Sequence, residues 1–210
     1  MAMDLHGILK QNEYYTNHYF TTIFEENAAD TISNWRQASK DSGEATPWAA
    51  FRDTSKNYYR IREKYLQLRN EAGSRELIES QAAEYIAALG YGKPDSINIE
   101  LNDEITVPVF HEERKPNGAP LLWVLLSVAE ERYDDILMGR IFGRLNAETE
   151  EYEGVLSENN DDVLAKLFFA GAEAPRWIIL IGINQIALID RNKWDKKKYL
   201  QFDLSAARSR

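Results

Sequence analysis

The first third of the chain carries a helical pattern of apolar positions. Between residues 4 and 40, apolar and aromatic side chains recur every three or four residues, which predicts one or two amphipathic helices with a break near residues 27–30. Turn chemistry follows in the segment DSGEATP. Its Pro47 suits the first turn of another helix behind a Thr46 cap, and that helix is expected to run to about residue 70.

The period of the pattern changes after a third helix. Ser74 is expected to cap this helix, and Gly90 is expected to close it. From residue 97 to residue 109, apolar residues alternate with polar ones in two runs separated by Asn102 and Asp103. This alternation predicts two strands joined by a hairpin turn.

A continuous apolar run at residues 121–126 follows the turn PNGAP. Such a run is typical of a strand buried on both faces. Residues 129–145 are predicted as helix or loop. A further helix is expected from about residue 160 to residue 172, capped by Asn159 or Asn160.

The final part of the chain reads APRWIILIGINQIALIDRNKWDKKKYLQFDL. Its apolar runs predict strands at residues 177–181 and 186–189 joined by a turn, then a basic segment at 191–198 and a strand at 199–204. The whole pattern predicts an α/β fold of the α+β kind, with N-terminal helices followed by a mixed sheet with flanking helices.

Composition is typical of a globular protein. A chain of 210 residues with 44% hydrophobic content can bury one good core. We expect an N-terminal helical region at residues 1–73 and an α/β core at residues 74–210, as two parts or as one continuous domain. The sequence lacks cysteine, any apolar run near 18 residues and a signal-peptide pattern, so we expect a cytoplasmic protein with no membrane partner.

Charge is spread unevenly along the chain. The formal net charge of −9 argues against a globally basic nucleic-acid binder. Residues 146–162 contain seven acidic and no basic residues, whereas residues 46–70 contain six basic and two acidic ones. The local sign of charge therefore matters more than the total.

Two basic clusters are candidates for contact with phosphate. The first, Arg52, Lys56, Arg60 and Lys64, has a spacing of four residues and forms one ridge of a helix. The second comprises five residues in the basic segment: Arg191, Lys193, Lys196, Lys197 and Lys198. Each cluster is either an ordinary solvated face or a DNA-binding surface.

Motifs for several enzyme classes are missing from the sequence. It has no glycine-rich phosphate loop, no G-x-G-x-x-G, no G-x-S-x-G and no H-E-x-x-H, and its three histidines are scattered. Acids that could converge on a magnesium ion near strand ends are Glu79, Asp103 and Glu112, with Glu84 and Glu113 as further choices. The alternative is that they are solvated surface acids.

Three segments together resemble a known family. These are SRELIESQAAEYIAALGYGKPDSINIELNDEITVPVF, GAPLLWVLL and the final APRWIILIGINQIALIDRNKWDKKKYLQFDL, covering roughly residues 74–204. They resemble the N-terminal, endonuclease-like region of bacterial type IIG restriction-modification proteins, in which this region precedes an adenine-specific DNA methyltransferase. The resemblance implies a restriction-endonuclease-like fold of the PD-(D/E)xK type.

In that family, one strand carries an aspartate and the next ends in Glu-x-Lys, and these groups hold magnesium against the scissile phosphate. The resemblance places the first position near residues 108–110 and the second on Leu126, Ser127 and Val128. Apolar residues there cannot hold a divalent ion. The chain also has no Asn-Pro-Pro-Tyr-type motif or glycine-rich cofactor strand, so neither a nuclease nor a methyltransferase motif is intact.

Three hypotheses of function remain open. In the first, the chain is the N-terminal domain of a DNA restriction-modification protein, with a degenerate catalytic motif and a role in DNA contact or scaffolding. In the second, it is an active magnesium-dependent endonuclease with displaced acids. In the third, it is a protein-interaction module with no DNA role. DNA and a methyltransferase domain, in cis or in trans, are the expected partners. No cofactor is expected in this chain, apart from magnesium in a nuclease and S-adenosylmethionine in a downstream methyltransferase.

The chain ends in SAARSR just after its last predicted strand. We therefore expect either the N-terminal domain of a longer protein or a stand-alone relative.

Overall fold

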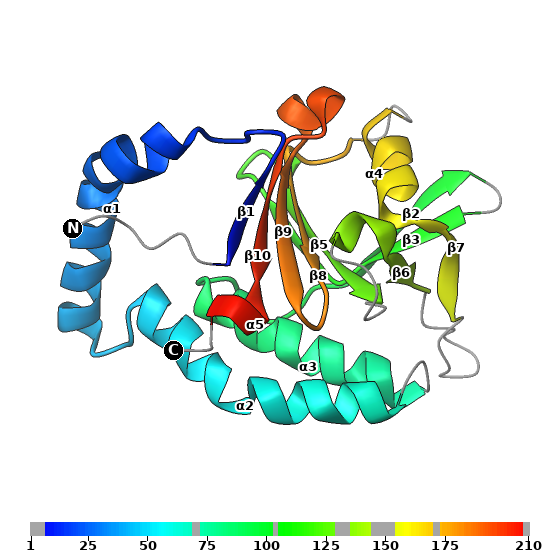
Figure 1. Cartoon of the computed structure of the whole chain (residues 1–210), viewed down its shortest axis with the longest axis horizontal. Helices are drawn as coiled ribbons and strands as arrows, with labels where there is room; N and C mark the ends of the chain where they lie inside the picture. The colour runs from blue at the N-terminus through cyan, green and yellow to red at the C-terminus, as the bar shows by residue number, and fades with distance from the viewer. Residues whose placement is uncertain are drawn as a thin grey trace.

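A computed structural model of the chain describes residues 7–68, 72–102, 105–128, 135–143, 154–169 and 173–207. Within these residues, eight strands form one mixed sheet in the order β1-β10-β9-β8-β5-β6-β7, with β4 also paired to β5 (Figure 1). β5 and β8 run parallel, and the other neighbouring strands run antiparallel. The strands are β1 (Ile8–Gln11), β4 (His111–Arg114), β5 (Pro120–Val128), β6 (Arg140–Phe142), β7 (Val155–Asn159), β8 (Trp177–Ile181), β9 (Gln185–Asp190) and β10 (Tyr199–Asp203).

A two-stranded hairpin of β2 (Ile97–Asn102) and β3 (Ile105–Val109) lies beside this sheet. The described helices are η1 (Tyr19–Ile23), α1 (Phe24–Ser42), α2 (Pro47–Leu68), α3 (Ala72–Ala88), η2 (Ile136–Met138), α4 (Asn160–Phe169), η3 (Arg191–Lys196) and α5 (Leu204–Ala207). The fold is therefore of the mixed α+β class, as the hydrophobic pattern predicts. In the described part of the chain, no helix is both long and apolar enough to cross a membrane.

Helices cover both faces of β5. Successive side chains of a strand point to opposite faces. Val124 and Leu126 accordingly join a core with α2 and α3, whereas Trp123 and Leu125 join a core with α4. This covering of both faces confirms the interpretation of the continuous apolar run as a strand buried on both sides.

The α3 helix ends as the sequence predicts. Gly90 has a φ of 91°, and the Tyr91 N–H donates to the Ile86 carbonyl at 3.0 Å. This is the Schellman arrangement, in which a left-handed residue lets the chain satisfy the last helical carbonyls. The start of α3 differs from prediction, because the helix begins at Ala72 and the expected cap, Ser74, is a buried residue inside it.

The interpretation of residues 4–40 as helical throughout is wrong at its start. Ile8–Gln11 form strand β1, which pairs with β10, and the chain then turns through Asn12 and Glu13, both with positive φ. The edge of β10 offers backbone hydrogen bonds that a four-residue stretch gains only by tertiary pairing. The expected break near residues 27–30 is also absent, since α1 runs through them.

Three more strands lie where the sequence predicts none, and the first of them is β4 at residues 111–114. Residues 140–142 form β6 inside a segment predicted as helix or loop, and residues 155–159 form β7 inside the acidic stretch. The alternating apolar pattern of β6 and of β7 is too short to predict a strand, so pairing with the sheet decides the conformation of both segments. The expected Asn159 cap of α4 is confirmed, because Asn159 Oδ1 accepts from the Asp162 N–H at 2.9 Å.

Candidate functional site

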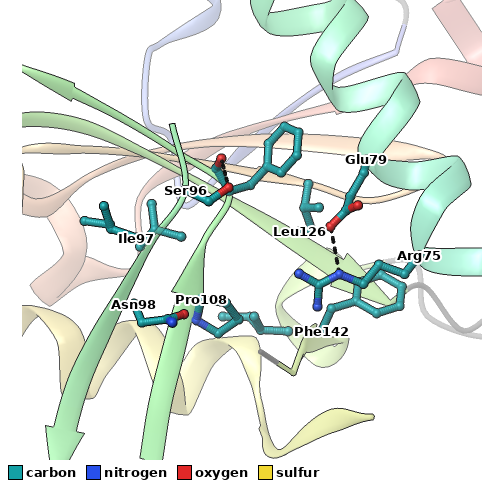
Figure 2. Close-up of a pocket in the computed structure, with 11 residues that line it drawn as sticks. Arg75, Glu79, Ser96, Ile97, Asn98, Pro108, Leu126 and Phe142 are labelled. Carbon is teal, nitrogen blue, oxygen red and sulfur yellow. Dashed lines mark hydrogen bonds and ion pairs between the residues drawn. The ribbon is translucent and has the colours of Figure 1, made fainter. Parts of the chain in front are cut away.

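A cleft with a volume of about 150 Å³ opens where α3, the β2–β3 hairpin and the β5–β6 end of the sheet meet (Figure 2). Charged and polar side chains line one part of it, and apolar side chains line the rest. The lining residues are Arg75, Glu79, Ser96, Ile97, Asn98, Pro108, Val109, Phe110, Leu126, Ile141 and Phe142.

Arg75 and Glu79 form an ion pair at the cleft. They lie four residues apart on α3, so both side chains leave the same face of the helix. Arg75 Nε donates to Glu79 Oε1 at 2.8 Å, and Nη1 donates to the Gly143 carbonyl. The guanidinium also lies 5.7 Å from the centre of the Phe142 ring. The Arg75 side chain is 10% exposed and that of Glu79 is 24% exposed, so the pair is only partly open to solvent.

The apolar wall of the cleft comes from β2, β3, β5, β6 and the residue after β3. Pro108, Phe110 and Leu126 occupy the positions to which the family resemblance assigns the metal-binding aspartate and glutamate. Val128, at the position of the lysine, belongs to the same core as Leu126. The two segments to which the resemblance assigns the motif therefore line one cleft, and the side chains that they contribute to it are apolar.

The candidate acids do not converge on this cleft. Glu79 lines it, but Glu112 is a buried residue of β4 that accepts from Trp123 Nε1 at 2.9 Å and Arg114 Nε at 2.5 Å. These bonds give Glu112 a structural role. Asp103 lies outside the described residues. Among the described residues, no group of three or more histidine, aspartate or glutamate side chains could hold a metal ion.

Glu113 has its own partner. His111 is almost fully buried; its Nδ1 accepts from the Asp95 N–H at 3.2 Å, which leaves Nε2 to donate to Glu113 at 2.9 Å. Burial, followed by the negative charge of Glu113, raises the pKa of the nearby Tyr91 above its ordinary value. Glu84, on α3, is half-buried and does not line the cleft.

The basic ridge on α2 is solvent-exposed along its whole length. Arg52, Lys56, Arg60 and Lys64 are all exposed, whereas Tyr58 and Tyr65 on the neighbouring ridge are buried in the core. Lys56 pairs with Asp53 at 3.0 Å, in a bridge whose two side chains are mostly exposed. The helix therefore packs through its tyrosines and presents the basic residues to solvent.

The basic segment at 191–198 is largely engaged within the molecule. Arg191 donates to the carbonyls of Ala174 at 2.9 Å and Phe168 at 3.3 Å. Lys193 Nζ lies 4.0 Å from the ring centre of Tyr14 and 4.7 Å from that of Tyr15. These interactions join η3 to the end of α4 and to the turn after β1.

Two of the remaining lysines of this segment also have partners within the molecule. Lys197 pairs with Asp161 of α4 at 2.5 Å and lies 4.1 Å from the Trp194 ring centre. Lys198 Nζ donates to the Glu13 carbonyl at 3.5 Å. Lys196 is exposed and has no ion-pair partner among the described residues. As a result, the charge available to an outside partner here is smaller than the sequence indicates.

Sequence reasoning missed Arg75. The only local signal was its spacing of four residues from Glu79, which is common on solvated helices and does not point to a cleft. A scan of protein-family models found no match to this chain, and no curated protein and no solved structure matches it.

Proposed function

We propose that this chain is a restriction-endonuclease-like domain of a DNA restriction-modification protein that contacts DNA without cleaving it. The observation that carries the proposal is the apolar lining of the cleft in Figure 2, where Pro108 and Leu126 are labelled. Phe110 also lines this cleft, and the family resemblance assigns metal-binding acids to these segments. Among the described residues that line the cleft, Glu79 is the one carboxylate, and it is paired with Arg75.

The chemistry of magnesium-dependent cleavage explains why this lining supports a non-cleaving domain. Magnesium takes oxygen ligands and is usually held by one or two carboxylates together with phosphate oxygens. An apolar side chain offers no such ligand, and an adjacent guanidinium already neutralises Glu79. The lining can therefore form an apolar wall beside a nucleic acid, but its described residues offer no pair of carboxylates for a metal.

The α2 ridge is the surface best suited to DNA contact. Lys64 lies twelve positions after Arg52, so the ridge is about 18 Å long at the helical rise per residue. That length matches roughly five base-pair steps of duplex DNA. Its side chains are exposed, whereas Lys193 and Lys197 of the basic segment are held by aromatic rings and by Asp161.

Duplex binding across a salt series tests the proposal. In fluorescence anisotropy, Arg60→Gln combined with Lys64→Gln should weaken binding and lower the slope of log K against log salt by up to about 0.9 for each phosphate that the variant no longer neutralises. The matched control is Lys93→Gln combined with Lys115→Gln, which removes the same charge from two exposed loop positions. Failure of the wild type to bind duplex DNA would overturn the proposal.

The same assay separates the two basic clusters. Charge reversal at Lys196, Lys197 and Lys198 tests the second cluster directly. If this triple variant weakens binding while the α2 variant does not, then the DNA-binding surface lies on η3 and the assignment to α2 is wrong. The triple variant also breaks the bond to Asp161, so its fold must be checked by circular dichroism.

An active nuclease with displaced acids is favoured by one observation, namely that Glu79 lines the cleft. The two functions differ in a cleavage assay with magnesium. Our proposal predicts intact DNA with the wild type. Magnesium-dependent cleavage that disappears in Glu79→Gln would favour the nuclease instead.

A further inference from the structure

Two aromatic side chains of α2 lie on its exposed side, beside the α2 ridge. Trp48 is 43% exposed and Tyr59 is 52% exposed. At about 100° per residue around the helix axis, both fall within about 40° of Arg52, the first residue of the ridge. Figure 1 shows α2 along the lower edge of the molecule. The two aromatic residues and the basic residues therefore share one outward face.

Contacts within the protein support each of the two rings. The Tyr59 ring lies edge-on to that of Tyr58, with ring centres 5.0 Å apart, and Tyr58 is fully buried. The Trp48 ring centre lies 6.2 Å from that of Trp35 and 5.8 Å from the Arg36 guanidinium. Each residue is thus held by a neighbour while about half of it stays open to solvent. A ring that is already held loses little side-chain entropy when a partner stacks on it.

The charges on this face favour an anionic partner. All four basic residues of the α2 ridge are exposed, and two exposed acids, Asp53 and Glu63, lie among them. Basic side chains therefore remain in excess on the face, although Asp53 pairs with Lys56. A row of phosphate groups complements such a face.

The spacing of the two rings fits a strand with unpaired bases. Tyr59 lies eleven positions after Trp48, which is about 16 Å along the helix axis. A nucleic-acid strand with stacked bases advances about 3.4 Å per nucleotide, so the rings lie about five nucleotides apart. Proteins that bind single strands combine basic residues along the backbone with aromatic rings on which bases stack. Along a duplex, by contrast, the faces of the bases are covered by their neighbours.

We propose that the exposed face of α2 binds single-stranded DNA, with bases stacked on Trp48 and Tyr59 and with phosphates contacted by the α2 ridge. This binding mode rests on the proposed DNA contact and names the form of DNA that the surface takes. Duplex DNA meets the basic residues without stacking on the rings. It should therefore bind more weakly near physiological salt, where contacts to phosphate alone are weak.

Fluorescence anisotropy with a labelled oligothymidylate of about 16 nucleotides tests the role of the rings. Tyr59→Ala should weaken binding about fivefold or more, the loss typical of one stacked base, without changing the slope of log K against log salt. Tyr59→Phe keeps the ring and should bind as the wild type does. Arg60→Gln combined with Lys64→Gln should instead lower the slope.

Trp48→Ala should weaken binding by a similar factor. Circular dichroism checks that this variant remains helical, since Trp48 contacts Trp35. The matched control is Phe169→Ala, which removes an exposed ring from the end of α4. Because α4 and α2 pack on opposite faces of β5, this control should leave binding unchanged.

A duplex of the same length separates single-strand stacking from the proposed function. A single strand that binds no more tightly than the duplex, or that still binds fully after Trp48→Ala combined with Tyr59→Ala, overturns the stacking mode and leaves the DNA contact standing. Binding of the single strand alone supports stacking and overturns the contact with duplex DNA. Binding of neither form overturns both.

Discussion

At the scale of single residues, one buried polar cluster ties together the end of β5, η2 and the start of α4. The Asn160 side-chain amide donates to Ser127 Oγ and to the Ile136 carbonyl, each at 2.7 Å. Asn160 and Ser127 are fully buried, and these two bonds satisfy the Asn160 amide nitrogen, whereas Asn160 Oδ1 has no partner among the described residues. Gly139 lies against this cluster, and a Cβ atom there would be 2.7 Å from Ser127 Oγ and 2.8 Å from the Val128 carbonyl oxygen.

Gly139→Ala should therefore destabilise the protein by about 1–3 kcal/mol, because the added methyl group overpacks the cluster against backbone that cannot yield. Equilibrium unfolding in urea measures the free energy of unfolding. Gly92→Ala is the matched control, since a Cβ atom there meets nothing within 4 Å, and it should change stability by less than about 0.5 kcal/mol. Equal effects of the two substitutions would show that the cluster has room for the methyl group.

At the scale of elements, the least expected feature is the attachment of β1 to the sheet. This short strand pairs with β10 at the sheet edge. Tyr14 of the turn after it and Phe20 of η1 pack against Leu200. Lys193 of η3 lies over the rings of Tyr14 and Tyr15. Basic residues that resemble a DNA-binding cluster in the sequence thus hold the N-terminal segment in place.

Lys193→Met should loosen β1 while leaving the centre of the sheet unchanged. Removal of the cation–π interactions should lower the free energy of local opening by about 1 kcal/mol. The amide hydrogens of residues 8–11 should therefore exchange roughly fivefold faster. Lys196→Met removes the same charge from an exposed neighbour and is the control. If both variants speed exchange of β1 equally, net charge rather than the aromatic interaction is responsible.

At the scale of the whole molecule, buried tyrosines link stability to pH. Burial is the main reason why the pKa values of Tyr14 and Tyr199 lie above the ordinary value of 10.0. The hydrogen bond that Tyr199 donates to Asp135, at 2.8 Å, raises the pKa of Tyr199 further. The folded state keeps both tyrosines protonated, whereas in the unfolded chain they ionise near the ordinary pKa of 10.0.

The sign of the resulting pH dependence follows from proton binding. Above pH 10 the folded state binds more protons than the unfolded state, so the free energy of unfolding falls as pH rises. This stabilising contribution is complete below about pH 10 and is lost as the pH rises through the raised pKa of the folded state. Urea unfolding between about pH 8 and pH 11 should show the decline.

Tyr199→Phe should make this alkaline decline shallower, because it removes one of the tyrosines responsible. It should also cost about 1 kcal/mol at neutral pH, since the bond to Asp135 can no longer form. Tyr59→Phe, at an exposed position of α2, is the control and should leave the pH profile unchanged. An alkaline decline of the same steepness in wild type and Tyr199→Phe would exclude Tyr199 as its source.

Features that depend on neighbouring residues follow from the sequence alone. Gly90 ends α3 because only its own backbone has to adopt the left-handed conformation. Alternation at Ile97 to Val109 predicts a hairpin, and continuous apolar character predicts the doubly buried β5, because each pattern records which side chains leave water. The position of the altered nuclease motif on β3 and β5 rests on the family resemblance and stays part of the proposal.

Features that depend on distant residues arise only in the packed fold. β1 is a strand because β10 lies beside it, and no local pattern in residues 8–11 records that neighbour. Arg75 belongs to a cleft only because α3 packs near Phe142 and Gly143. Lys193 and Lys197 are likewise held by Tyr14, Tyr15 and Asp161, which are remote in sequence. Hydrophobic periodicity specifies which face of an element is buried, whereas tertiary packing specifies which side chains meet there.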